Sequence, residues 1–218
     1  MRVVGVDEAG RGSFLGPLVV GGFAVDDSEV DALRACGARD SKQLSPSARE
    51  EVYARIAQLG TLASVALSPR TVDRAVKDGG LNELEADAFG RVIRKLGCEE
   101  ARVDACDTNE ARFGRRVALR AGPGIRVVAR HHADRDDPVV GAASIVAKVR
   151  RDRAIARLRT SLGGGIGSGY PSDAQTVAFV RAHLARSDGA PSWLRLSWAT
   201  MTRVKRTPPA VTLETFHP

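Results

Sequence analysis

The sequence predicts an α/β fold built on one sheet of mixed strand direction. Three strand-like apolar runs come first, and the later strands alternate with helices, which is the order typical of such a sheet. The chain has 218 residues, of which 43% are hydrophobic. That length and composition suit one domain with a small appendage, and they exclude a disordered chain.

The first two predicted strands enclose a glycine-rich loop. Residues 2–6 and 17–25 are apolar runs typical of buried strands. Gly10, Gly12 and Gly16 lie between them. We therefore expect a hairpin with a long, functional loop.

The remaining elements are predicted from capping residues and apolar periodicity. Helix-start signals are a capping residue before proline at Ser45-Pro46, Ser68-Pro69 and Asp137-Pro138, and capping-box spacing at Asn82/Glu85 and Ser172/Gln175. The predicted helices are 45–59, a short one from 68, 82–96, 109–120, 137–162, 172–185 and 191–203, the last carrying Trp193 and Trp198. The further predicted strands are 61–67, 101–106 and 125–130.

Charge and cysteine content narrow the class of protein. The formal net charge is +7 and the sequence pI is about 9.9, which favours a polyanionic partner over a merely basic surface. The three cysteines form no CxxC pair, so we expect no disulfide framework or zinc ribbon, and a reducing, cytoplasmic location. We expect no membrane span, and no signal peptide because Asp7 and Glu8 interrupt the first apolar run.

Acidic residues gather where three predicted elements begin or end. Two Mg²⁺ ions about 4 Å apart can activate a water and stabilise the leaving oxygen of a phosphodiester. Such a site needs several carboxylates from different elements, because Mg²⁺ prefers oxygen ligands. The candidates are Asp7 and Glu8 after the first strand, Asp104 and Asp107 at the fourth, and Asp134, Asp136 and Asp137 before the long helix.

The pattern leaves choices within each cluster. Adjacent residues of a strand point to opposite faces, so Asp7 and Glu8 share a site only if the strand bends or ends between them; otherwise one of them caps or forms a salt bridge. The pattern does not choose between Asp104 and Asp107. Asp137 is better explained as a helix cap, which leaves Asp134 or Asp136 for a metal.

Five blocks of the sequence resemble ribonuclease HII of the archaeal type. They are DEAGRGSFLGPLVV (7–20), RDSKQLS (39–45), DACD (104–107), AASIVAKVRRD (142–152) and GSGYPSD (167–173). The resemblance implies the ribonuclease H-like fold, with a five-stranded mixed sheet flanked by helices and a small helical C-terminal part. It implies hydrolysis of the RNA strand of RNA–DNA hybrids, and incision 5′ to single ribonucleotides in duplex DNA that leaves 3′-hydroxyl and 5′-phosphate ends.

The resemblance also implies roles for particular residues. Two ions of Mg²⁺ or Mn²⁺ would be held by Asp7, Glu8, Asp104 and Asp134. The residues expected at the substrate are Gly10, Arg11 and Gly12 at the ribose 2′-hydroxyl, Tyr170 on the sugar of the following deoxynucleotide, and Ser41, Lys42 and Lys148 at phosphates.

Each of these assignments has a structural alternative. Gly10 and Gly12 could serve only a tight turn, and Tyr170 could be a packing aromatic. Lys42 and Lys148 could be solvated, and Ser41 and Ser144 could be local backbone caps.

One position departs from the family pattern. His132 stands where the family commonly has a lysine, two residues before Asp134. Histidine is only partly charged near neutral pH, so activity is expected to depend more on pH. A zinc site at His131-His132 is not expected, because no nearby residue completes it.

The last residues resemble a sliding-clamp-binding peptide. Leu213 and Phe216 match its aliphatic and first aromatic positions, whereas Ala210 and His217 do not match. The alternative is a disordered end. We expect a catalytic domain at 1–186, a helical extension at 187–206 packed on it, and this tail at 207–218.

The leading hypothesis is a monomeric two-metal endoribonuclease on RNA–DNA hybrids and ribonucleotide-containing duplex DNA. A DNA junction nuclease on the same fold is the second enzyme hypothesis, and cleavage of all-DNA substrates distinguishes it. A non-catalytic nucleic-acid-binding adaptor is the third, and it predicts binding without metal-dependent cleavage.

Overall fold

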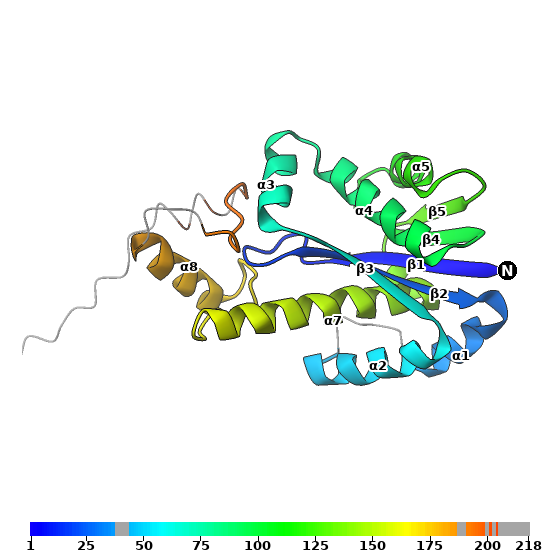
Figure 1. The fold of residues 1–218 in the computed structure, drawn as a ribbon, viewed down its shortest axis with the longest axis horizontal. Coiled ribbons are helices and arrows are strands. Elements are labelled where there is room, and N and C mark those ends of the chain that lie inside the picture. The colour runs from blue at the N-terminus through cyan, green and yellow to red at the C-terminus, as the bar shows by residue number, and fades with distance from the viewer. Residues whose placement is uncertain (38–43, 187–190, 199–200, 202–203, 205–218) are drawn as a thin grey trace, which may run out of the picture.

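A five-stranded mixed sheet forms the centre of the computed structural model, which describes residues 1–37, 44–186, 191–198, 201 and 204 (Figure 1). The strands are β1 (Arg2–Ala9), β2 (Leu18–Asp26), β3 (Thr61–Leu67), β4 (Glu100–Asp104) and β5 (Arg126–Arg130). Their order is β3-β2-β1-β4-β5, with β2 antiparallel to β1 and β3, and with β1, β4 and β5 parallel. The predicted mixed sheet and the first hairpin are confirmed.

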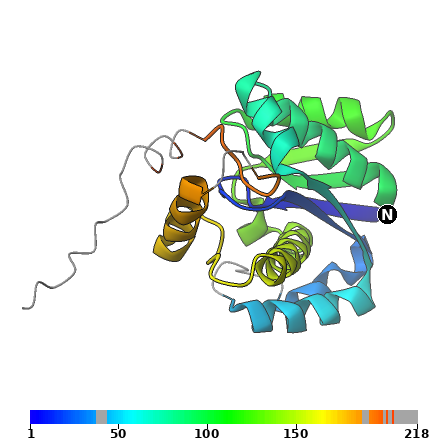
Figure 2. The same cartoon turned by 60° about the vertical axis from the view of Figure 1, so that its left-hand side comes forward.

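Helices cover both faces of this sheet. They are α1 (Val30–Ala35), α2 (Pro46–Leu59), α3 (Pro69–Lys77), α4 (Leu81–Leu96), α5 (Glu110–Ala121), α6 (Ala133–Asp136), α7 (Pro138–Ser161) and α8 (Ala174–Arg186), with a 3-10 turn at Asp27–Glu29. In Figure 1, α4 and α5 lie on one side of the sheet, and α7 lies on the other with α2 and α1 beyond it. Figure 2 shows α8 beyond the end of α7.

Alternation along β1 divides the core between the two faces. Val4 and Val6 belong to the cluster formed with α4 and α5, whereas Val3 belongs to the cluster formed with α7 and α2. The close approach of α7 to β1 needs glycine: a Cβ atom on Gly5 would lie 2.2 Å from the carbonyl oxygen of Val139 in α7. This alternation places odd-numbered β1 residues, including Asp7, on the α7 side.

Three of the predicted helix caps are confirmed. Ser45, Ser68 and Asp137 each accept a hydrogen bond from a backbone N–H in the first turn of the helix that follows. Asn109 caps α5 in the same way, although no cap was predicted there. The short helices α1 and α6 were not predicted, because neither is long enough to show an apolar period. No described helix is both long and apolar enough to cross a membrane.

The two capping boxes are wrong. The residue before α4 is Gly80, and Asn82 and Glu85 accept hydrogen bonds from the side chain of Arg11 instead. At α8 the cap is Asp173 rather than Ser172: its carboxylate accepts from the backbone N–H of Gln175 and Thr176. At α4, the loop after β1 therefore takes the polar side chains that a capping box would use.

The helix predicted over 191–203 is wrong for its described start, 191–198. This stretch contains a turn and has no helix up to Trp198, and Leu194 forms a β-bridge with Leu15. The backbone N–H groups of Leu196 and Ser197 donate to the carboxylate of Asp73 in α3. Tertiary pairing with the loop after β1 thus overrides local helix preference.

Candidate active site

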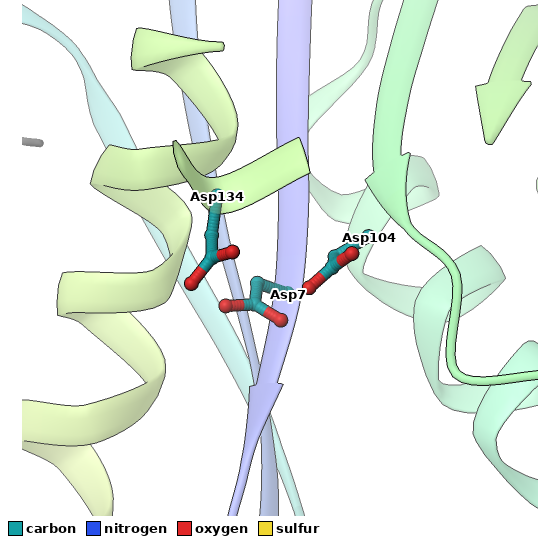
Figure 3. Close-up of side chains that lie close together, drawn as sticks. All are labelled: Asp7, Asp104 and Asp134. Atoms are coloured by element: carbon teal, nitrogen blue, oxygen red, sulfur yellow. The ribbon is translucent and has the colours of Figure 1, made fainter. Parts of the chain in front are cut away.

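Three carboxylates converge at the ends of two parallel strands. Asp7 lies in β1, Asp104 ends β4 and Asp134 lies in α6, and one oxygen from each falls within 4.8 Å of the others. Figure 3 shows Asp7 between the other two side chains. The β1–β4 pairing ends at Val6 and Val103, so Asp7 and Asp104 are the next residues along. The backbone N–H of Ala133 donates to Asp104 at 3.2 Å, which ties α6 to β4.

Burial makes negative charge costly at this group. Asp7 is 4% exposed, and burial raises its pKa above the ordinary value of 3.8. The charge of Asp134 adds to this increase in pKa, while the charge of Lys148 and a hydrogen bond from Ser144 oppose it. A divalent cation would relieve the repulsion, and an all-oxygen donor set suits Mg²⁺ or Mn²⁺.

Glu8 lies beside this group from the other face of the sheet. β1 stays paired with β2 through Glu8 and Ala9, without the bend that a shared site was expected to require. Burial, followed by the charges of Asp7, Glu85 and Asp104, holds the pKa of Glu8 well above its ordinary value, and Arg11 opposes this. Glu8 therefore senses the charges of Asp7 and Asp104, but it is not one of the converging group.

The structure distinguishes the acids in the other two clusters, where the sequence left a choice. Asp107 accepts hydrogen bonds from Arg112, Arg116 and the backbone N–H of Asn109, so it anchors the start of α5. These hydrogen bonds, led by that from Arg112, lower the pKa of Asp107. Asp136 is exposed and lies outside the converging group, whereas Asp134 lies within it.

The arginine of the glycine-rich loop is held by helix α4. Its Nε lies 2.9 and 3.0 Å from the two carboxylate oxygens of Glu85, and its Nη2 donates to Asn82 at 2.7 Å. Glu85 is fully buried and also accepts from the thiol of Cys106. The side chain of Arg11 is thus held by hydrogen bonds within the protein.

A second arginine holds the same loop from the C-terminal stretch. Arg195 is 0% exposed, and its guanidinium donates to the carbonyl oxygens of Gly10, Arg11 and Gly16 at 2.7 to 3.2 Å. Gly10 has a φ of 84°, a conformation that favours glycine. A Cβ on Gly12 would meet no atom within 4 Å, so this glycine leaves open space.

Tyr170 stands on a neighbouring glycine-rich turn. The backbone N–H groups of Phe14 and Leu15 donate to the carbonyl oxygen of Gly169, which joins this turn to the first loop. Asp173 accepts from the N–H of Ser168 at 2.6 Å and so closes the turn. Tyr170 is half-buried, with one face over the guanidinium of Arg151.

The other predicted residues have mixed outcomes. Lys148 lies near the acids: its ammonium donates to Ser144 at 2.5 Å, and its charge acts on Asp7. His132 is exposed and has a φ of 59° at the start of α6. Ser41 and Lys42, like Leu213 and Phe216 of the tail, lie outside the described residues.

Sequence reasoning missed three buried charges around the loops: Glu85, Arg151 and Arg195. Glu85 does carry a signal, since it lies four residues before Phe89 on the apolar stripe of α4. Arg195 stands between two leucines in an otherwise apolar stretch. No sequence pattern indicates which loop either side chain reaches.

Comparison with known proteins agrees with this geometry. The family model described as ribonuclease HII matches residues 4–201. The chain belongs to the ribonuclease HII family. The "Ribonuclease HII" of Cenarchaeum symbiosum is 46% identical over 199 residues, covering 91% of this chain and 95% of that protein. Ribonuclease HII enzymes hydrolyse the RNA strand of RNA–DNA hybrids with divalent metal ions, and the three aspartates form a group that could bind such ions.

Solved structures show the same fold. The ribonuclease H2 of Pyrococcus horikoshii OT3 has a TM-score of 0.86 and 35% identity, covering 94% of this chain and 97% of that one. The ribonuclease HII in the PCNA complex from Archaeoglobus fulgidus has a TM-score of 0.85 and 38% identity over the same shares. The predicted fold and family are therefore confirmed.

Proposed function

We propose that this chain is an endoribonuclease that both hydrolyses the RNA strand of hybrids and incises 5′ to ribonucleotides embedded in duplex DNA. The observation that carries the proposal is the convergence of Asp7, Asp104 and Asp134 within 4.8 Å, next to two glycine-rich turns. The products would carry 3′-hydroxyl and 5′-phosphate ends. The basic composition would add salt-sensitive affinity for the duplex.

The three aspartates would hold Mg²⁺ or Mn²⁺, with Glu8 contributing from the opposite face of β1. Two such ions supply water activation and stabilisation of the 3′-oxygen leaving group. Lys148 and Ser144 would keep the carboxylate of Asp7 oriented and ionised, because both favour its charged form. Of the four proposed metal ligands, Glu8 has the least structural support, because its side chain starts from the other face of the sheet.

Substrate recognition would use the two joined turns. The backbone of Gly10, Arg11 and Gly12 would meet the ribose 2′-hydroxyl, and the open side of Gly12 favours such an approach. Tyr170 would stack on the sugar of the next deoxynucleotide. Phosphate contacts would come from Lys148, and from Ser41 and Lys42 in the segment outside the described residues.

The decisive experiment is cleavage of duplex DNA carrying one ribonucleotide, with an all-DNA duplex as the control, in Mg²⁺, in Mn²⁺ and in EDTA. Asp7→Asn and Asp134→Asn should lower kcat by at least about 100-fold while duplex binding remains. Asp136→Asn, on the same short helix but outside the converging group, is the matched control and should keep its activity. Equal cutting of both duplexes, or cutting in EDTA, would refute the proposal.

We also propose that the chain is a cytoplasmic monomer with a catalytic domain at 1–186, an extension at 187–206 and a clamp-binding tail at 207–218. The Archaeoglobus fulgidus relative, whose structure is titled as a complex with PCNA, supports a clamp as partner. Titration of a sliding clamp with the full chain and with a Leu213→Ala, Phe216→Ala variant tests this. Equal affinity of the two proteins would contradict it.

A further inference from the structure

Arg151 is a buried charge on α7 that metal binding does not explain. Its side chain is only 4% exposed, and its Cζ lies 4.3 Å from the centre of the Tyr170 ring. Its Nη2 also donates to the carbonyl oxygen of Ser168 at 3.3 Å. The guanidinium therefore contacts the turn that carries Tyr170 both through its flat face and through one N–H.

The same side chain packs against the other glycine-rich loop. A Cβ atom on Gly10 would lie 2.4 Å from Nε and 2.6 Å from Cδ of Arg151. A Cβ on Gly169 would lie 3.1 Å from its Nη2. Since the backbone of Leu15 also bonds to Gly169, Arg151 fills the space between two loops that are already joined.

Burying the charge of Arg151 between the two loops costs free energy. Burial lowers the pKa of Arg151, with only partial compensation from Tyr170 and Asp152. Its Nε has no hydrogen-bond partner within the described part of the chain. An apolar side chain would fill the same volume without desolvating a charge. Unlike an apolar side chain, a guanidinium is a planar cation, and it attracts the face of an aromatic ring.

We propose that Arg151 is a positioning residue for substrate selection. It holds the ring of Tyr170 in the plane on which the deoxynucleotide after the ribonucleotide stacks, and it fixes that plane relative to Gly10. This inference rests on the proposed function, in which Tyr170 and the Gly10 loop contact adjacent nucleotides. Arg151 should therefore govern the preference for an RNA-to-DNA junction more than it governs the hydrolytic step.

The experiment measures a ratio: kcat/KM for a duplex with one ribonucleotide, divided by kcat/KM for a continuous RNA–DNA hybrid. Arg151→Met should lower the ratio about 3- to 30-fold, the range expected for loss of a cation–π contact. Arg151→Lys, which keeps the charge without the planar face, should give an intermediate ratio. Arg153→Met is the matched control, because it removes a guanidinium that lies 4.8 Å from the ring of Tyr53 on the same helix. Its ratio should stay within about twofold of the original.

A double-mutant cycle separates positioning of the ring from a general structural effect. In a Tyr170→Leu background, Arg151→Met should change the ratio by less than about twofold. Equal fold-changes in both backgrounds, or an unchanged ratio for Arg151→Met alone, would overturn the proposal. If melting curves show that Arg151→Met does not fold, Arg151→Lys takes its place in the cycle, and an unchanged ratio there overturns the proposal as well.

The original protein separates failure of this inference from failure of the proposed function. If it does not cut the single-ribonucleotide duplex in either metal, the proposed function is overturned, and this inference with it. If it cuts that duplex while the cycle shows no coupling, only the positioning role of Arg151 is overturned.

Discussion

Replacing Arg195 by methionine should destabilise the loop after β1 more than any ordinary surface change. The guanidinium is fully buried and donates to three backbone carbonyl oxygens, those of Gly10, Arg11 and Gly16. Methionine fills much of the same volume but donates nothing. Arg195→Met would therefore leave three carbonyl groups without this partner.

The size of the effect follows from these contacts. The carbonyl of Gly10 keeps the hydrogen bond from the hydroxyl of Ser13 at 3.0 Å, so the main loss falls on the carbonyls of Arg11 and Gly16. Each of these costs about 1 kcal/mol or more, whereas removing a buried charge returns part of its desolvation cost. Burial lowers the pKa of Arg195 to about 10, which shows that this desolvation is appreciable. We expect a net loss of about 2 kcal/mol in the free energy of unfolding. For a chain of this length, that loss corresponds to a fall in Tm of about 4–8 °C.

Thermal unfolding at pH 7 measures this loss, and hydrogen exchange locates it. Arg159→Met is the matched control, because it removes a single bond to the carbonyl oxygen of Gly167 at 3.0 Å from an exposed position. Its Tm should fall by less than about 4 °C. Amide exchange in residues 10–16 should accelerate only in the Arg195 variant. A fall in Tm for Arg195→Met no larger than that of the control would refute the reasoning.

Three further predictions concern other parts of the molecule. Gly21→Ala should cost about 1–3 kcal/mol in unfolding free energy, because its Cβ would lie 2.4 Å from the backbone nitrogen of Ala147; a denaturation midpoint equal to the original would contradict this. Hydrogen bonds, led by that from the N–H of Ser168, lower the pKa of Asp173 from 3.8 to about 2. The ionised carboxylate of Asp173 therefore stabilises the folded state fully above about pH 4, and this stabilisation is lost as pH falls toward 2. In urea titrations, the difference in unfolding free energy between the original protein and Asp173→Asn should shrink from pH 7 to pH 3. His132→Lys should flatten the pH–rate profile between about pH 6 and 8, because lysine stays charged across that range; identical profiles would show that charge at this position is immaterial.

Much of the fold could be predicted because its signals are local. The third strand, 61–67, is predicted to the residue, and the caps at Ser45 and Ser68 lie where the sequence places them. The helix expected over 191–203 is absent from residues 191–198 for a tertiary reason. Leu194 pairs with Leu15 and the next residues bond to Asp73, and neither partner is near in sequence.

For the candidate site too, the local features could be predicted and the tertiary contacts could not. The acid clusters could be predicted at the ends of elements, and the structure brings one aspartate from each cluster together. Choosing between Asp104 and Asp107 required the arginines of α5, whose contact with Asp107 no spacing indicates. For Glu8, in contrast, a local pattern was enough. Strand alternation predicted that it would face away from Asp7, and β1 continues without a bend.

The buried charges around the first loop explain why a glycine-rich segment can be well ordered. Glycines alone would leave residues 10–16 with high conformational entropy in the unfolded chain and few side-chain contacts in the folded one. Glu85 fixes the loop from α4, Arg195 fixes it from the C-terminal stretch, and Arg151 packs on it from α7. Each of these charges costs free energy to bury, so apolar side chains at these positions would give a more stable protein. Hydrogen bonds from a charged side chain are directional, however, and they set which way each carbonyl group of the loop points. In the function proposed above, this fixed loop would present the open side of Gly12 to the ribose 2′-hydroxyl, and a fixed orientation suits recognition of a single hydroxyl.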